Sequence, residues 1–92
     1  MIRSFGDKQT EALFRDEVVP AFHAMARCAK RRLEAVHAAS RLNDLRVPPS
    51  NRLEKLKGER RDFHSIRIND QWRVIFRWIE GHAHAVTIID YH

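Results

Sequence analysis

The chain has almost no cysteine and none of the long apolar stretches that mark export or membrane insertion. Its single cysteine, Cys28, has no partner for an intramolecular disulfide, which favours a reducing, cytoplasmic setting. No apolar run of ~20 residues occurs, and the first residues lack the apolar core of a signal peptide, so neither a membrane span nor export is expected. With three Gly and three Pro, the composition also excludes collagen-like and linker-like chains.

The length and composition of the chain are typical of one globular domain. The chain has 92 residues, of which 43% are hydrophobic and 32% charged, too apolar for a disordered tail and too charged for a membrane protein. This length supports one modest core, so we expect residues 1–92 to form a single domain.

Positive charge is in excess. Seventeen Lys and Arg residues against twelve Asp and Glu give a net charge of +5 and a pI near 10.1. The field of such a molecule favours an anionic partner, nucleic acid first among them. The alternative is that the charge serves solubility alone.

Helix signals occupy the first half and strand signals the second. A short strand is expected over residues 2–5, a helical turn capped by Asp7, an interruption at Val18-Val19-Pro20, and an amphipathic helix from Ala21 to near Ala39. Residues 63–68, 72–79 and 83–91 predict two successive hairpins, with residues 53–56 as a candidate further strand. The expected fold class is α+β, with two N-terminal helices packed on a mostly antiparallel β-sheet.

The middle predicted strand has two different faces. Trp72, Val74, Phe76 and Trp78 should face the helices, which leaves Arg73 and Arg77 on the other face. If the turn at residues 69–71 has three residues, Arg67 opposes Arg73, and three arginines share one surface. Opposed like charges are destabilising unless an anion relieves them, which favours a binding surface. A slipped register or an acidic neighbour would remove that argument.

The most basic short stretch, residues 51–61, is suited to contacts with phosphates. Alternatively, its cations protect a sheet edge from pairing with other chains. The residues concerned are Arg52, Lys55, Lys57, Arg60 and Arg61.

Three polar residues end the chain: Asp90, Tyr91 and His92. RNA cleavage needs a base for the attacking 2′-hydroxyl, cations for the phosphorane and an acid for the leaving oxygen. Asp90 or His92 could exchange protons, Tyr91 could orient or stack on a base, and Arg73 could hold the phosphate. The alternative is a frayed polar terminus.

Two other features carry weaker chemistry. His82 and His84 could point the same way, but no third ligand matches them, so surface histidines are favoured over a metal site. The sequence offers no residue that could be argued to act as a general base for the Cys28 thiol, so Cys28 is expected to serve in helix packing. We expect no metal and no cofactor.

The chain resembles the HigB family of bacterial toxins, within the RelE/ParE superfamily. The resemblance rests on Leu56-Lys57-Gly58, on the stretch from His64 to Arg73, and on the terminal Asp90-Tyr91-His92. It implies a toxin encoded beside a HigA-like helix-turn-helix antitoxin, which enters the ribosomal A site and cuts messenger RNA there. ParE-like relatives instead inhibit DNA gyrase, and a non-catalytic ribosome binder is a third alternative.

By that resemblance, Lys57 and Arg73 neutralise phosphates, and Asp90, Tyr91 and His92 are the terminal catalytic and substrate-positioning residues. Some HigB toxins carry a histidine where this chain has Glu54, a carboxylate that can act as a base but repels phosphate. For the antitoxin, the candidate contact is the basic side of the second helix, made of Arg27, Lys30, Arg31 and Arg32.

Overall fold

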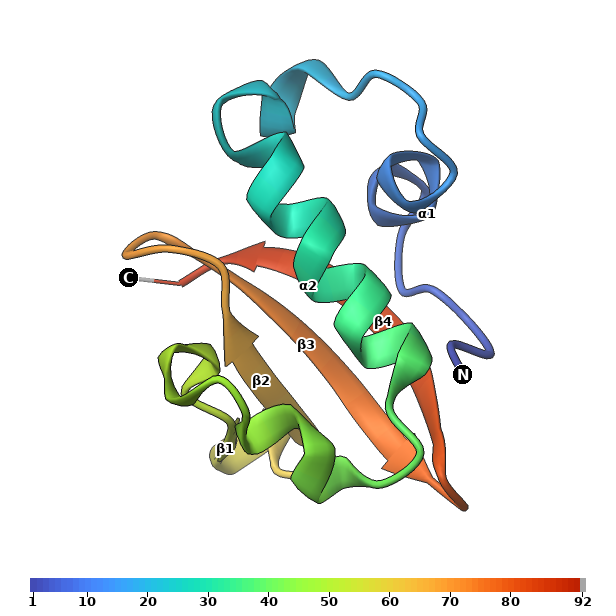
Figure 1. Cartoon of the computed structure of the whole chain (residues 1–92), viewed down its shortest axis with the longest axis vertical. Coiled ribbons are helices and arrows are strands. Elements are labelled where there is room, and N and C mark those ends of the chain that lie inside the picture. Colours follow the sequence, from blue (N-terminus) through green and yellow to red (C-terminus); the bar gives the residue numbers. More distant parts are fainter. Residues whose placement is uncertain (92) are drawn as a thin grey trace.

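A computed structural model, which describes residues 1–91, has two layers (Figure 1). Helices α1 (Lys8–Phe14) and α2 (Ala26–Ala38) cover one face of an antiparallel sheet. The strands lie in chain order: β1 (Glu54–Lys55), β2 (Phe63–Arg67), β3 (Trp72–Ile79) and β4 (His82–Asp90). Four 3-10 turns connect the elements: η1 (Pro20–Met25), η2 (Leu42–Arg46), η3 (Pro49–Asn51) and η4 (Gly58–Arg60). The predicted α+β class is confirmed.

The helical half differs from the prediction in one respect. Asp7 caps α1 as predicted, because its Oδ1 accepts the Thr10 N–H at 2.7 Å. The second helix, predicted from Ala21, begins as the 3-10 turn η1 and becomes α-helical only at Ala26. Pro20 opens that turn, where its missing N–H costs no hydrogen bond. No helix within residues 1–91 is long and apolar enough to cross a membrane.

The sheet is a meander with the predicted register. Arg67 pairs with Arg73 across the β2–β3 turn, and the strand predicted over residues 53–56 is reduced to the two residues of β1. The β3–β4 ladder shifts by one residue between Ile75 and Arg77, and Ala85 on β4 takes a φ of 52° there. This bulge sets which β4 side chains face the helices, because each shift of one residue exchanges the two faces.

Next to the same bulge, the strand predicted over residues 2–5 is interrupted. This segment runs parallel to β4 but forms only two isolated bridges, Ile2 with Ala83 and Phe5 with Val86. Between them, the Ala85 N–H donates to the Ser4 side chain at 2.8 Å instead of to a backbone carbonyl. A continuous strand is therefore replaced by an interrupted one.

The core lies between the helices and the inner face of the sheet. Phe76, Val74 and Leu33 are fully buried there, and Trp72 and Trp78 pack against this cluster, as the alternation predicted. The Phe22 ring of η1 meets Trp72 edge-on, with centroids 5.5 Å apart. The opposite face of β3 is therefore left for Arg73 and Arg77.

Candidate active site

Arg73 lies at the centre of the outer face of the sheet, the face turned away from α1 and α2. Its side chain is only 13% exposed. Its Nη1 donates to Ser65 Oγ at 3.0 Å and forms an ion pair with Glu54 Oε1 at 3.0 Å. Tyr91 covers the guanidinium, with Arg73 Cζ 4.9 Å from the ring centroid, a cation–π contact. Arg73, Ser65, Glu54 and Tyr91 are called the arginine site below.

Strand register explains why these residues meet. Glu54 pairs with Ser65, and Ser65 pairs with Ile75, so all three side chains lie on the outer face, one row from Arg73. Ser65 is fully buried, and its hydroxyl fixes the guanidinium from beneath. Glu54, with a side chain 48% exposed, holds Arg73 from the open side.

The three predicted arginines share the outer face, but two of them have carboxylate partners. Arg67 is bonded to Asp70, and Arg73 to Glu54, so the protein itself supplies the negative charge that opposed arginines need. The expectation that an external anion relieves this repulsion is corrected accordingly. An incoming phosphate must instead compete with Glu54 for Arg73.

Asp90 and Tyr91 diverge at the end of β4. Asp90 pairs with Trp72, and its Oδ2 accepts the Gln71 side-chain N–H at 3.0 Å, whereas Tyr91 faces Arg73. Successive residues of a strand point to opposite faces, which accounts for the separation. The structure therefore brings Tyr91, but not the Asp90 carboxylate, into the arginine site. His92 lies outside the described residues.

The predicted phosphate-contacting stretch lies along the β1 edge of the sheet. Its five cations are all exposed: Arg52, Lys55, Lys57, Arg60 and Arg61. Lys55 pairs with His64 and so faces away from Glu54. Burial and the positive charge of Lys55 lower the pKa of His64, whose ring stacks on Phe76.

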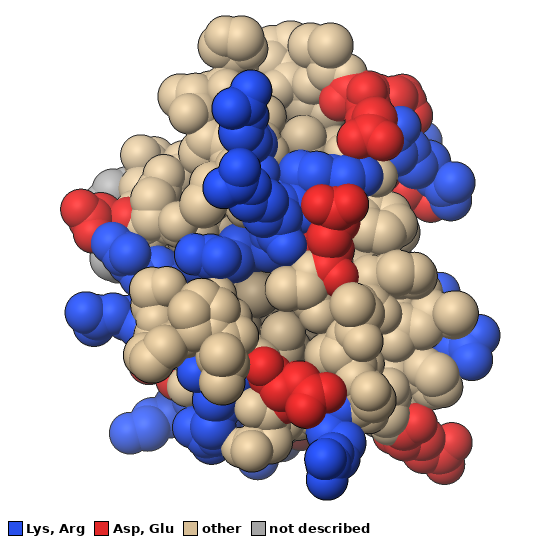
Figure 2. Space-filling view, in the orientation of Figure 1, with Lys and Arg blue, Asp and Glu red and all other residues tan. Residues whose placement is uncertain are grey.

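The basic side of α2 lies in the helical layer, across the sheet from Arg73. Figure 2 shows Lys and Arg side chains gathered across the middle of this face. Lys30 is engaged within the fold, bonded to the Phe14 carbonyl and paired with Asp16 at 3.1 Å, and Arg32 Nε donates to the Arg67 carbonyl at 2.9 Å. The two exposed cations of the predicted set are Arg27 and Arg31.

A cleft of about 340 Å³ also opens in this helical layer. It is lined by residues of α1, of the α1–η1 connection, of η1 and of α2, including Leu13, Val18 and Arg27. Neither Arg73 nor Tyr91 lines it. The arginine site is thus distinct from this cleft and lies on the outer face of the sheet.

Sequence reasoning missed two residues that hold the site together, Ser65 and Gln71. Ser65 carries no signal of its own, because its contact with Arg73 appears only once the β2–β3 register is known. Gln71 stood within a recognised turn, but its side-chain contact with Asp90 joins residues nineteen positions apart. His82 and His84 pair with Ile79 and Arg77 on the outer face, and no group of three or more metal-ligating side chains occurs among residues 1–91.

This fold and its arginine site define a small basic toxin-like domain, and comparison with known proteins identifies the family. The model of the HigB-like toxin family, described as the RelE-like toxin of the type II toxin-antitoxin system HigB, matches residues 3–92. The chain belongs to this family. It is therefore a type II toxin, whose partner is an antitoxin.

Two curated relatives extend over the whole chain. Toxin HigB-1 of Vibrio cholerae serotype O1 is 38% identical over 96 aligned positions, which cover 100% of this chain and 98% of the relative. Endoribonuclease HigB of Proteus vulgaris is 32% identical over 93 positions, which cover all of both chains.

Solved structures support the fold. The YoeB–YefM complex from Staphylococcus aureus superposes with a TM-score of 0.61 at 18% identity, covering 100% of this chain and 98% of the other. YafQ from E. coli superposes with a TM-score of 0.63 at 10% identity, covering 98% and 93%. At these identities the likeness concerns the fold alone.

Proposed function

We propose that this toxin is a ribosome-dependent endoribonuclease that cuts messenger RNA and so arrests translation and growth. The observation that carries the proposal is the arginine site, in which a nearly buried guanidinium is held by Ser65, covered by Tyr91 and paired with Glu54. The name of the Proteus vulgaris relative, an endoribonuclease that aligns with this chain over its whole length, supports the same reaction.

In the proposed reaction, Arg73 binds the scissile phosphate. The RNA 2′-hydroxyl attacks the phosphorus, a base takes its proton, and the bond from phosphorus to the 5′-oxygen breaks as that oxygen gains a proton. Arg73 offsets the charge that develops on the phosphorane, and Lys57 adds a second cation. Tyr91 stacks on a base or orients it, since this residue is 38% exposed and its ring lies beside Arg73.

Glu54 is the proposed base. Its carboxylate already lies 3.0 Å from Arg73 Nη1, so a phosphate bound to Arg73 would displace it toward the neighbouring ribose. Asp90 and His92 are the alternative proton-transfer groups. The proposed contacts to RNA phosphates beyond the cleaved bond are Arg52, Lys55, Arg60, Arg61 and Arg67.

Ribosome dependence is proposed because the arginine site lies on a face of the sheet where Glu54 and Tyr91 are exposed, although Arg73 itself is nearly buried. The 340 Å³ cleft of the helical layer does not contain the arginine site, so the toxin itself does little to enclose RNA. A ribosomal A site that holds the messenger in an extended conformation would supply the missing orientation. This setting is cytoplasmic, in agreement with the single cysteine.

For the antitoxin, we propose a HigA-like helix-turn-helix protein that contacts the basic side of α2. Arg27 and Arg31 are exposed there and suit acidic side chains, whereas Lys30 and Arg32 have partners within the fold and contribute at its margin.

The test is cleavage of ribosome-bound messenger RNA by purified variants. Arg73→Ala should lower the cleavage rate by about 10²–10³, as does loss of a transition-state donor in other enzymes, and deletion of residues 91–92 should abolish cleavage. Arg15→Ala, an exposed arginine of the helical layer, is the matched control and should cut normally. Full cleavage by Arg73→Ala with native circular dichroism would refute the site. Growth arrest without cleavage by the unaltered toxin would support a non-catalytic inhibitor of the ribosome or DNA gyrase.

A further inference from the structure

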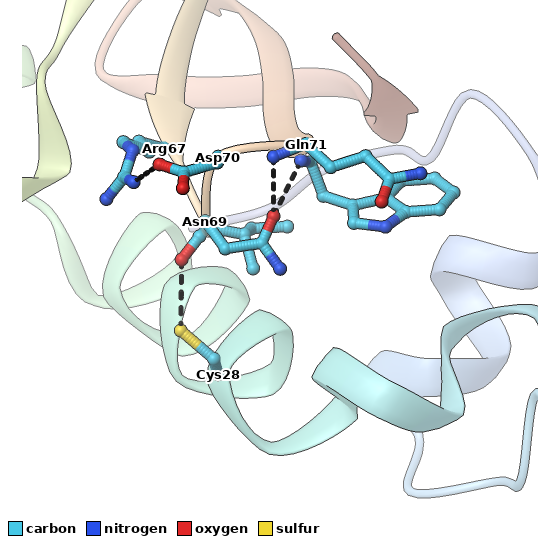
Figure 3. A network of polar contacts seen from close by, with 7 residues as sticks. Cys28, Arg67, Asn69, Asp70 and Gln71 are labelled. Atoms are coloured by element: carbon cyan, nitrogen blue, oxygen red, sulfur yellow. Dashed lines mark hydrogen bonds and ion pairs between the residues drawn. The ribbon is translucent and has the colours of Figure 1, made fainter. Parts of the chain in front are cut away.

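The β2–β3 turn, residues 68–72, has an internally fixed conformation. The Asn69 Oδ1 atom accepts the backbone N–H groups of both Gln71 and Trp72, each at 2.8 Å (Figure 3). The Ile68 N–H donates to the Trp72 carbonyl at 2.9 Å and closes the hairpin. An asparagine that caps two successive amides in this way holds a turn in one geometry, so the position of Gln71 is set by local bonds.

The turn is also anchored to helix α2. Cys28 Sγ donates to the Ile68 carbonyl at 3.3 Å, and Arg32 Nε donates to the Arg67 carbonyl at 2.9 Å. Figure 3 shows Cys28 of the helix directly beneath the turn. Bonds from α2 therefore reach two successive carbonyls at the start of the turn, and they fix it relative to the core.

Gln71 holds the end of β4 against this fixed turn. Its backbone carbonyl accepts the Tyr91 N–H at 2.6 Å, and its side-chain Nε2 donates to Asp90 Oδ2 at 3.0 Å. The β3–β4 ladder ends at the pair Trp72–Asp90, so the Gln71 contacts extend the attachment one residue beyond the ladder. Figure 1 shows the end of β4 beside the β2–β3 turn.

We propose that Gln71 is a positioning residue that fixes the Tyr91 ring over Arg73. Its two contacts hold consecutive residues, and the second of these, Tyr91, carries the ring that covers the guanidinium. Asp90 thereby acquires a role apart from proton transfer, because its carboxylate is the acceptor through which the Gln71 side chain holds the strand end. The consequence for catalysis rests on the proposed endoribonuclease function.

The first test measures the attachment of Tyr91 and the cleavage of messenger RNA separately. In Gln71→Ala the side-chain bond to Asp90 is lost, so hydrogen exchange of the Tyr91 amide should accelerate by about tenfold, the worth of one net hydrogen bond. The kcat for ribosome-bound messenger should fall by about tenfold or more with KM nearly unchanged, since the ring is misplaced while Arg73 remains. Gln9→Ala, an exposed glutamine of α1, is the control and should change neither quantity.

Reversal of the bond polarity gives a sharper test. Gln71→Glu places two carboxylates together and should accelerate Tyr91 exchange beyond the alanine variant. Adding Asp90→Asn should restore slow exchange, because the asparagine amide can then donate to the new carboxylate. Restored exchange together with restored kcat supports the positioning role. Restored exchange with kcat still lost assigns Asp90 to the chemistry and overturns a purely positioning role for it.

Two further outcomes would overturn the proposal. Unchanged Tyr91 exchange in Gln71→Ala would mean that Gln71 does not hold the chain end, and faster exchange with full kcat would mean that the attachment does not serve catalysis. If the unaltered toxin cuts no RNA, the proposed function fails, whereas the exchange measurement still decides whether Gln71 positions Tyr91.

Discussion

At the scale of single residues, a carboxylate occupies the place where a phosphate is expected to bind. The Glu54–Arg73 pair gives the free protein an internal substitute for the substrate anion. Such a pair keeps a nearly buried guanidinium neutralised between reactions, since an unpaired buried charge is costly. Under the proposed function, an RNA phosphate would compete with Glu54 for Arg73.

Neutralising Glu54 should therefore affect binding and catalysis in opposite directions. Glu54→Gln should bind a non-cleavable RNA several-fold more tightly, because the competing charge is gone. Its cleavage rate should fall by about 10²–10³, typical of a lost general base. Binding titrations and single-turnover cleavage measure the two effects, with the exposed Glu59→Gln as control. A normal cleavage rate in Glu54→Gln would assign proton transfer to Asp90 or His92.

His64 should make the stability of the fold depend on pH. Its pKa is lowered below 6.5 by burial and by Lys55, so the folded state binds this proton less readily than the unfolded chain does. Stability contributed by the neutral imidazole is present above pH 6.5 and is lost as the pH falls below it. Urea denaturation of the wild type and of His64→Gln between pH 8 and pH 5 should show a smaller decline in the variant. Parallel curves would contradict this assignment.

At the scale of elements, the hairpins could be predicted and their irregularities could not. Period-two alternation from Trp72 to Trp78 and the three-residue turn were enough to predict the Arg67–Arg73 pairing. The bulge at Ala85 has no local signal, yet it decides that Tyr91 rather than Asp90 faces Arg73. The arginines of the outer face could thus be predicted from the sequence. The placement of the Asp90 and Tyr91 side chains on opposite faces could not.

The same limit applies to the helices. Apolar residues at steps of three and four predicted the amphipathic helix from Ala21 to near Ala39. Of these residues, Phe22, Met25, Ala29, Leu33 and Val36 are buried, whereas Ala26 is only partly buried. The spacing of apolar residues did not distinguish the 3-10 turn η1 from the helix α2, because one apolar stripe runs through both. Glu54 likewise became a neighbour of Arg73 only through the two-residue strand β1, which propensity alone does not specify. Ser65 instead lies beside Arg73 through the β2–β3 pairing.

One buried hydroxyl connects the helical layer to the sheet. Thr10 of α1 is fully buried, and its Oγ1 accepts the Ile88 N–H of β4 at 2.9 Å. Thr10→Val preserves the shape but leaves that amide unsatisfied, and should lower the free energy of unfolding by about 1–3 kcal/mol. Thr10→Ser keeps the hydroxyl and should retain most of the stability. Equal urea midpoints for the valine variant and the wild type would contradict the role of this bond.

At the scale of the whole molecule, positive charge is divided between two faces. The outer face and the β1 edge carry the cations proposed for RNA, and the α2 side carries Arg27 and Arg31. A division of this kind allows an antitoxin and RNA to bind at separate surfaces.

Charge reversal on α2 should therefore weaken antitoxin binding selectively. Arg27→Glu combined with Arg31→Glu should reduce affinity for the antitoxin by about tenfold or more, since each exposed ion pair contributes about 0.2–1 kcal/mol and reversal adds repulsion. Cleavage should stay within about twofold of the wild type, because these side chains lie across the sheet from Arg73. Titration calorimetry measures the affinity, with Arg46→Glu as an exposed control. Unchanged affinity would place the antitoxin elsewhere.

The proposed arginine site should cut RNA only when the ribosome orients the substrate. Primer extension on one defined messenger RNA, incubated with purified toxin with and without translating ribosomes, is the most direct test. New 5′ ends are expected only in the lane with ribosomes, and none there when Arg73→Ala replaces the wild type. Equal cleavage of free RNA would exclude ribosome dependence, and unaltered cleavage by Arg73→Ala would exclude the arginine site.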